Sequence, residues 1–130
     1  MISTISISTR NRSEMIDITS TVKEHMQKAG LQEGVCYIYV PHTTAGITIN
    51  EGADPSVVTD IQAMLNTLVP WEGPYRHLEG NAAAHIKSSV VGSSVTVLVE
   101  SGQLKLGTWQ AIFFCEFDGP RTRKVHIKFQ

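Results

Sequence analysis

Two short stretches of the chain concentrate residue types that can move protons or bind a small ligand. Their imidazole, carboxylate and amide side chains belong to His42, Asn50, Glu51, His77, Glu79, Asn81 and His85. Imidazoles change protonation near neutral pH, carboxylates are common general acids and bases, and both bind divalent metals. Amide side chains bind polar ligand atoms through hydrogen bonds. These stretches therefore predict proton-transfer chemistry or a metal site.

Three of the histidines fall at expected ends of secondary-structure elements, where ligands are often held. His42 follows a buried strand and leads into a glycine-containing turn. His77 lies in a loop, and His85 lies on the helix that the loop enters, on the same helix face as Asn81. Three imidazoles with carboxylates nearby would give an open three-ligand site for a divalent metal. Seven residues separate His77 from His85, which is not a diagnostic zinc spacing, so ordinary polar side chains remain the alternative.

The start of the helix at Asn81 offers free backbone N–H groups to a phosphate anion. The competing interpretation is that the polar residues at helix starts are only N-caps, and for Asp54 the N-cap is favoured. Glu51 would in the same way only stabilise a turn. The two remaining histidines, His25 and His126, are expected at the surface.

Other site chemistries have no support in the sequence. The glycine-rich phosphate-binding loops GxGxxG and GxxxxGK[ST] are absent, and so is the GxSxG motif of serine hydrolases. Cys36 and Cys115 lie far apart within apolar runs. We therefore expect reduced, buried thiols instead of a disulfide or a thiol nucleophile.

Hydrophobic periodicity predicts the elements that must position these residues. Helical spacing predicts helices at about 17–29, from Pro55 to the break at Pro70, and at about 82–90. Apolar alternation or short apolar runs predict strands around 5–7, 34–40, 47–49, 95–100, 104–106, 108–117 and 123–129. The order β-α-β-β-α-α-β-β-β-β favours an α+β fold with a mainly antiparallel sheet or sandwich, two longer helices and one short helix. Residues 1–130 are expected to form a single domain.

Two of the predicted strands are apolar on both faces. The strand 34–40 is therefore expected at the centre of a sheet. The strand 108–117 is expected to be covered on both sides, by helices or by another subunit, with Trp109 packed against protein instead of a ligand. In the last strand Val125, Ile127 and Phe129 are expected to face inward, and Lys124, His126 and Lys128 outward.

The overall charge argues against a nucleic-acid-binding protein. Eleven basic and twelve acidic residues give a net charge of -1, so there is no global basic field. Arg121, Arg123, Lys124 and Lys128 would be the contacts to nucleic acid, but we expect a solvated face there. The charged fraction of 18% is low for a small monomer and suggests an oligomer. No apolar stretch is long enough for a membrane span or a signal peptide, so we expect a cytoplasmic protein without membrane contact.

The segments that carry these residues are similar to the YjbQ family over essentially the whole chain. The matching segments are HTTAGI from His42, Asn50–Glu51, Asp54–Pro55, His77, Glu79–Asn81, AHIK from Ala84, Ser94–Gly102, GTWQ from Gly107 and EFDGPR from Glu116. The GTWQ segment after a strand is highly specific. Many members have a longer and more acidic stretch between positions 79 and 85, where this chain has alanines, so no extra carboxylates are assigned a role there.

The resemblance implies an α+β fold assembled as a homotrimer, with a secondary thiamine-phosphate synthase activity. It implies one site built from His42, His77 and His85, where a divalent metal, Zn²⁺ or Mg²⁺, would bind. Around that site it implies Asn50, Glu51, Glu79 and Asn81. Trp109, Gln110 and Arg121 match family motifs, either as ligand contacts or as residues that fix the trimer.

The implied reaction displaces pyrophosphate from a pyrimidine methyl carbon by a thiazole nitrogen, so it requires positive charge where pyrophosphate leaves. Lys87, Arg121 and the helix start at Asn81 are the candidates. Histidine ligands suit Zn²⁺ better than Mg²⁺, so we expect this reaction to be a side activity. The leading prediction is a metal-assisted, synthase-like transferase that acts on a small phosphorylated or heterocyclic metabolite. The alternative is a non-catalytic homotrimeric protein that binds a metabolite or a metal.

Overall fold

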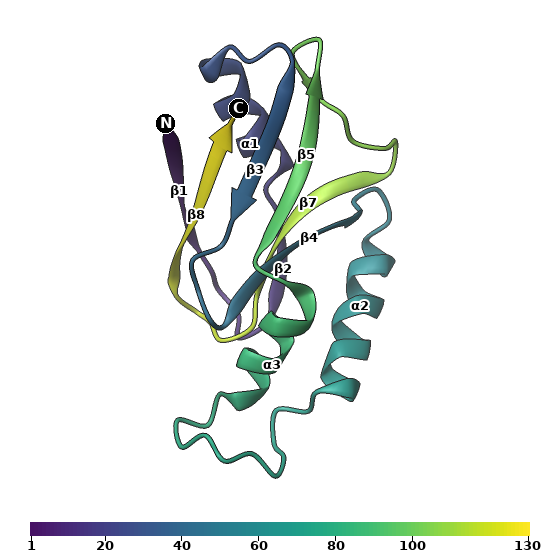
Figure 1. The fold of residues 1–130 in the computed structure, drawn as a ribbon. Coiled ribbons are helices and arrows are strands. Elements are labelled where there is room, and N and C mark those ends of the chain that lie inside the picture. The colour runs from purple at the N-terminus through teal and green to yellow at the C-terminus, as the bar shows by residue number, and fades with distance from the viewer.

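The computed structural model describes all 130 residues, which form three helices and eight strands (Figure 1). The helices are α1 (Thr19–Ala29), α2 (Pro55–Leu68) and α3 (Ala82–Val91). The strands are β1 (Ile2–Ser8), β2 (Glu14–Asp17), β3 (Gly34–Tyr39), β4 (Ala45–Glu51), β5 (Ser94–Glu100), β6 (Gln103–Leu104), β7 (Gln110–Glu116) and β8 (Thr122–Phe129). The predicted order is confirmed except for β2, whose four residues are too few to show a period.

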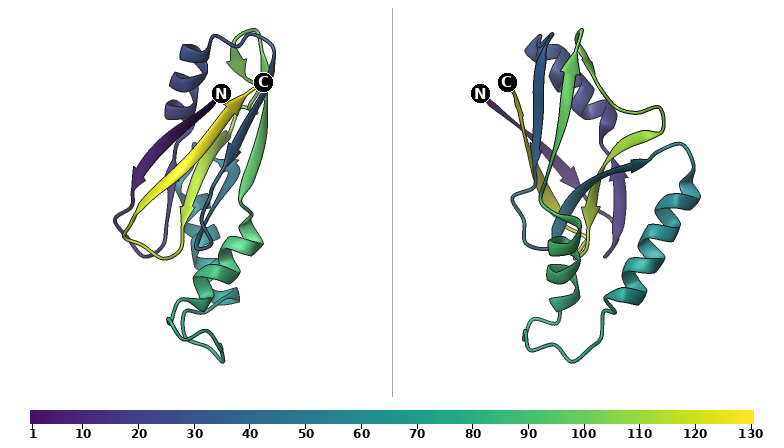
Figure 2. Two further views of the ribbon diagram at one scale, coloured as in Figure 1. Left: turned by 60° about the vertical axis from the view of Figure 1, so that its left-hand side comes forward. Right: turned by 45° about the vertical axis from the view of Figure 1, so that its right-hand side comes forward.

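The strands form two antiparallel sheets that face each other. The larger sheet has the order β1-β8-β3-β5-β6, and the smaller has the order β2-β7-β4. The main core lies between them and contains Ile38 from β3, Phe114 from β7 and Ile127 from β8, together with Val22 and Met26 from α1. Helices α2 and α3 lie outside the smaller sheet (Figure 2). The predicted α+β fold with antiparallel sheets is therefore confirmed.

Strand β7 is the middle strand of the smaller sheet and is covered on both faces, as predicted. Ile112 and Phe114 point into the core between the sheets. Phe113 on the opposite face belongs to a second cluster, against which Val58 and Leu65 of α2 pack. Helices of the same chain therefore bury the outer face of β7.

The central position predicted for β3 is confirmed, whereas the packing expected for Trp109 is not found in the single chain. Strand β3 is central in its sheet, but Tyr37 and Tyr39 remain 44% and 50% exposed on the outer face. Trp109 is 64% exposed and does not pack in the core. Tyrosine and tryptophan combine an apolar body with a polar atom, so their presence in an apolar run does not require burial.

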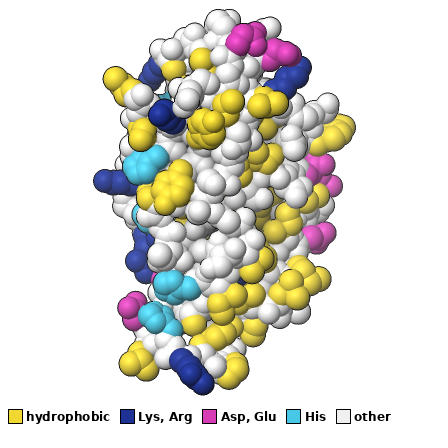
Figure 3. Space-filling model, in the orientation of Figure 1, with side chains coloured by type: hydrophobic (Ala, Val, Ile, Leu, Met, Phe, Trp, Pro, Cys, Tyr) yellow, Lys and Arg dark blue, Asp and Glu magenta, His cyan; other side chains and the backbone are white.

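Helix α2 begins as predicted but leaves much of its apolar stripe uncovered. The Asp54 carboxylate accepts a hydrogen bond from the Ser56 amide at 2.9 Å, and Pro55 occupies the first turn. No residue of α2 is fully buried, and Leu68 at its C-terminal end is 69% exposed. Figure 3 shows hydrophobic side chains gathered on the side of the molecule where α2 lies.

Both cysteines are free and buried, as expected. Burial raises the pKa of the Cys36 and Cys115 thiols to about 12, so neither is a thiolate at neutral pH. No helix of the protein has the length and apolar character that a membrane crossing requires.

Candidate functional site: a cleft lined by three histidines

Two adjoining cavities form a polar cleft where β3, β4, α3 and the β7–β8 connection meet. The larger, of about 350 Å³, is lined by His42, Thr43, Ala45, His85, Ser88, Ser89, Gly92 and Ser93. The smaller, of about 210 Å³, is lined by Thr43, Thr44, His77, Glu79, Asn81, His85, Asp118 and Arg121. Because Thr43 and His85 border both cavities, we treat them together as the histidine cleft. His42 and His85 line the larger cavity and His77 and His85 the smaller one, so His85 is the histidine that the two cavities share.

The fold brings these residues together by placing two strand connections and the start of a helix at one edge of the sheets. His42 and Thr43 lie in the connection from β3 to β4. His85 lies in the first half of α3, which packs against β4. Asp118 and Arg121 lie in the short connection between β7 and β8. The antiparallel pairing of Ala45 with Glu116 sets the two connections side by side.

His77 and His85 form an aromatic pair at the mouth of the cleft. Their ring centroids are 5.1 Å apart in an edge-to-face arrangement. Glu79 places a carboxylate oxygen 3.8 Å from His77 Nε2, with both side chains largely exposed. In water such a contact contributes little to stability. Two imidazoles and a carboxylate in this arrangement can donate and accept protons next to a bound ligand.

His42 is held by a hydrogen bond from the backbone of β8. Its Nε2 atom accepts a hydrogen bond from the Lys124 amide at 2.9 Å. The pKa of His42 is lowered, first because burial disfavours the charged ring and second because the Arg123 guanidinium is close. His42 is therefore neutral at neutral pH.

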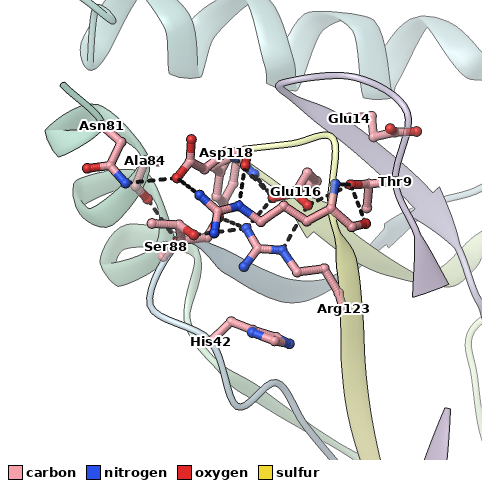
Figure 4. Close-up of polar contacts among 12 residues, drawn as sticks. Thr9, Glu14, His42, Asn81, Ala84, Ser88, Glu116, Asp118 and Arg123 are labelled. Atoms are coloured by element: carbon pink, nitrogen blue, oxygen red, sulfur yellow. Dashed lines mark hydrogen bonds and ion pairs between the residues drawn. The ribbon is translucent and has the colours of Figure 1, made fainter. Parts of the chain in front are cut away.

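A buried ion pair lies directly behind the cleft wall (Figure 4). Arg123 and Glu116 are 3% and 0% exposed, and Arg123 Nε donates to Glu116 Oε1 at 2.8 Å. The Thr9 hydroxyl also donates to this carboxylate at 2.8 Å. Arg123 Nη2 donates to the Thr44 hydroxyl oxygen at 2.8 Å, so the pair fixes a residue of the cleft.

The hydrogen bonds of Glu116 keep it ionised although it is buried. Burial alone raises its pKa, but the bonds from Arg123, the Asp118 amide and Thr9 outweigh this effect and lower the pKa below its ordinary value. The sequence interpretation missed this pair. The alternation that points Val125 inward also places Arg123 on the inner face of β8. A charged residue at an inward-facing position of this strand was the available sign of a buried ion pair.

Asn81 does not cap α3 through its side chain, contrary to the N-cap interpretation. Its Nδ2 atom donates to the Asp118 carboxylate at 2.8 Å, and Arg121 Nη2 donates to the same oxygen at 2.7 Å. Asn81 Oδ1 is buried without a partner. The backbone N–H groups of Ala82 and Ala83 have no acceptor within the protein, so the helix start keeps unpaired donors next to Asn81, which lines the smaller cavity.

Four residues predicted for the site do not line the cleft: Asn50, Glu51, Lys87 and Gln110. Glu51 pairs with Gln110 at the opposite end of β4 and β7, six residues from Ala45 and therefore about 20 Å away. There each makes local bonds: Asn50 accepts from the Glu51 amide, Glu51 from the Ala53 amide, and Gln110 from the Gly107 amide. Glu51 is only nine positions after His42 in sequence, but the extended strand β4 lies between them and places them far apart in space.

Lys87 turns away from the cleft toward α2. Its Nζ atom donates to Asn66 Oδ1 at 2.5 Å, and the residue is only 4% exposed. The pKa of Lys87 is lowered, first by burial and second by the nearby Arg12. The side chain thus links two helices and does not contribute charge to the cleft.

The donor set does not fit the predicted metal site. No group of three or more histidine, cysteine, aspartate or glutamate side chains is placed to hold a metal ion. His42 also uses Nε2 as an acceptor for the Lys124 amide, so ligation through that atom would break the hydrogen bond. The three histidines share a cleft but not a coordination sphere.

Two of the four basic residues considered for nucleic-acid contact are already engaged. Arg123 is buried in its ion pair with Glu116, and Arg121 is paired with Asp118. Lys124 and Lys128 remain exposed on β8, as predicted.

Comparison with known proteins shows the family to which the chain belongs. The family model described as UPF0047 protein YjbQ-like matches residues 3–130. The YugU protein of Bacillus subtilis is 57% identical over 129 residues, which cover 98% of both chains. A UPF0047 protein of Methanocaldococcus jannaschii is 52% identical over 122 residues, or 94% of this chain and 88% of the relative. The chain therefore belongs to the YjbQ-like UPF0047 family, and the predicted resemblance is confirmed.

Solved structures show the same fold. A YjbQ/UPF0047 protein of Clostridium acetobutylicum matches with a TM-score of 0.97 and 51% identity, over 98% of this chain and 99% of that chain. A protein of Aeropyrum pernix matches with a TM-score of 0.96 and 36% identity, over 100% and 98%. The names of these relatives state no reaction, so a function must be argued from the cleft.

Proposed function

We propose that the protein is an enzyme that acts on a small phosphorylated or heterocyclic metabolite in the histidine cleft. The observation that carries this proposal is the composition of the smaller cavity, whose lining contains no hydrophobic residue but includes two histidines, a glutamate and an arginine. A cavity of this kind binds a polar ligand and offers it groups that transfer protons.

The anionic part of the ligand is expected near Arg121 and the start of α3. The Ala82 and Ala83 amides have no acceptor, and the positive end of the helix dipole lies there. Asp118 neutralises part of the Arg121 charge and holds its guanidinium in place. A phosphate group would therefore complete hydrogen bonds that the free protein leaves unmade.

His77 and His85 are the proposed acid and base. One imidazole in the neutral form can accept a proton while its neighbour in the charged form donates one. The Glu79 carboxylate lies 3.8 Å from His77 Nε2 and so places a negative charge beside the ring nitrogen that would exchange the proton.

Thiamine-phosphate formation is one reaction that this cleft would support as a secondary activity. In that reaction a thiazole nitrogen forms a bond to a pyrimidine methylene carbon, and the bond from that carbon to pyrophosphate oxygen breaks. Arg121 and the α3 amides would stabilise the departing pyrophosphate. Because Arg121 is already paired with Asp118, this stabilisation is weaker than a free cation would provide.

The experiment measures binding and turnover separately. Pyrophosphate and thiamine phosphate are titrated calorimetrically, and product formation from the pyrimidine pyrophosphate and the thiazole phosphate is followed with purified protein. The variants His77→Ala and His85→Ala are expected to lose turnover by about 10²-fold or more. His25→Ala, outside both cavities, is the matched control and should behave as the parent protein. Equal activity in all variants would contradict the proposed site.

Binding without any turnover across phosphorylated and heterocyclic substrates would favour the alternative, a non-catalytic binding protein. Metal analysis of untagged protein belongs to the same experiment. Retention of one Zn²⁺ per chain, lost in the His85→Ala variant, would restore the metal-binding interpretation that the geometry of the single chain does not support.

We also propose that the protein assembles as a homotrimer. The exposed apolar side chains of α2, including Met64 and Leu68 at 56% and 69% exposure, support a covered face in the assembly. The low charged fraction is consistent with this arrangement.

A further inference from the structure

His42 differs from the other two cleft histidines because the backbone fixes one of its ring nitrogens. The Lys124 amide donates to His42 Nε2 at 2.9 Å. No protein group bonds to Nδ1, and the residue lines the larger cavity. Nδ1 is thus the ring nitrogen left available for a ligand in that cavity.

A backbone amide can only donate a hydrogen bond, so its partner nitrogen must carry a lone pair. A neutral imidazole has one nitrogen with a lone pair and one with a proton. With Nε2 as the acceptor, the proton lies on Nδ1. Protonation of Nε2 would place two N–H groups against each other and would break the bond.

We infer that His42 is locked as the neutral Nδ1–H tautomer and acts as the hydrogen-bond donor of the histidine cleft, where it recognises an acceptor oxygen or nitrogen of the ligand. The inference rests on the proposed function for the presence of a ligand. The tautomer itself is a property of the free protein.

Hydrogen bonds of Arg123 restrain the loop that carries His42. Arg123 donates to the Thr44 carbonyl oxygen at 3.2 Å and to its hydroxyl oxygen, which ties the same loop to β8 two residues beyond His42. Arg123 is in turn held by Glu116. The buried network therefore fixes the backbone of this loop next to β8, within reach of the Lys124 amide.

The charges that face His42 also disfavour its cationic form. Arg123 and Arg121 are the nearby positive groups, and Glu116, the nearby negative group, is already neutralised by Arg123. A neutral imidazole N–H can donate a hydrogen bond to the ligand without transferring its proton. Proton transfer is assigned to His77 and His85 in the proposed function. The same lock prevents His42 from binding a metal, because both nitrogens would then need lone pairs.

The tautomer is measured by long-range ¹H–¹⁵N correlation NMR on uniformly labelled protein at neutral pH, with His42 assigned by the loss of its signals in a His42→Asn variant. We expect a pyrrole-type shift at Nδ1 and a pyridine-type shift at Nε2. His126 is the internal control, because its Nδ1 faces the Thr4 hydroxyl at 2.9 Å, which can donate or accept. A proton on Nε2 of His42, or averaging of both tautomers as expected for His126, would overturn the inference.

The donor role is tested by pyrophosphate titration of two variants. In His42→Asn the side-chain amide reaches the place of Nδ1 and can still donate to the ligand. In His42→Gln the amide reaches the place of Nε2 and keeps only the contact with Lys124. We expect His42→Gln to bind pyrophosphate about tenfold more weakly than His42→Asn, which is the loss of one hydrogen bond.

Equal affinities of the two variants would overturn the donor role. If pyrophosphate does not bind the parent protein, the proposed phosphate ligand is wrong, and the NMR measurement still decides the tautomer. The two failures are therefore distinguishable.

Discussion

Arg123 and Glu116 carry full charges where almost no water reaches them. Arg123 donates hydrogen bonds to Glu116 and Thr44. Glu116 accepts hydrogen bonds from Arg123, from the Thr9 hydroxyl and from two backbone amides. The charge of each residue is therefore compensated mainly by the other. Removal of one partner leaves a buried charge without compensation, which is far more costly than loss of the same pair at the surface.

The variant Glu116→Gln tests this dependence. We expect the free energy of unfolding to fall by about 3 kcal/mol or more, because Arg123 keeps its charge and loses its counter-ion. Urea denaturation followed by circular dichroism measures the change. The matched control is Glu100→Gln in the exposed Glu100–Lys105 pair, for which we expect little change. Similar losses in both variants would contradict the argument.

The same carboxylate gives a pH dependence with a definite sign. The folded state lowers the Glu116 pKa below its ordinary value of 4.5. The unfolded state therefore binds the proton more readily, and the stability that Glu116 contributes is present above pH 4.5 and lost as the pH falls below it. Denaturation curves between pH 3 and 7 should show a steeper acid loss for the parent than for Glu116→Gln. Parallel pH curves would show that Glu116 is not the group responsible.

At the scale of elements, the cleft depends on the close packing of β4 against the end of α3. Gly46 of β4 lies beside Gly92, and the Ile47 amide donates to the Gly92 carbonyl oxygen at 3.0 Å. A Cβ atom on Gly46 would lie 2.6 Å from that oxygen and 3.2 Å from Val91 Cγ1. Both elements supply residues of the larger cavity, so their separation would change its shape.

We expect Gly46→Ala to lower the free energy of unfolding by about 1–3 kcal/mol, because the backbone oxygen cannot move without breaking the bond to Ile47. Pyrophosphate affinity should fall with it. Gly107→Ala is the matched control, because its Cβ would meet only the end of the Gln110 side chain, at 3.3 Å. A stable Gly46→Ala variant would show that β4 and α3 have more space than the structure gives them.

At the scale of the molecule, α2 is the element that the single chain leaves least covered. Its inner residues Val58 and Leu65 pack on the smaller sheet, while Met64 and Leu68 point outward. Contiguous apolar residues on a small protein with few charges favour contact with another copy.

We expect the parent protein to have a solution mass of three times 14.3 kDa, and Leu68→Glu to reduce it. The physical reason is that a carboxylate placed in a covered apolar face loses its hydration. Light scattering after gel filtration gives the mass. Leu98→Glu is the matched control, because Leu98 is similarly exposed, at 61%, but lies on β5. A trimer that survives Leu68→Glu and dissociates with Leu98→Glu would place the interface on the larger sheet instead.

Local patterns along the chain were enough to predict the helices, most of the strands and their order. Apolar periodicity has a direct local cause, because residues on one face of a helix or strand are buried together. The same periodicity predicted the buried faces of β7 and β8, and local cap chemistry predicted the start of α2 at Asp54. The short strand β2 offered no period and was missed.

Which polar residues come together depends on long-range packing. It joined His42 with His77 and His85, but it carried Glu51 and Gln110 to the far end of β4 and β7. It also redirected Asn81 from the helix start to Asp118. The chemistry of a side chain can be read from the sequence. Its hydrogen-bond partners depend on how the sheets and connections pack, because spacing along the chain does not give the distance between residues far apart in sequence. The sequence therefore supplied the chemical groups of the site, and the fold selected which of them share a cleft.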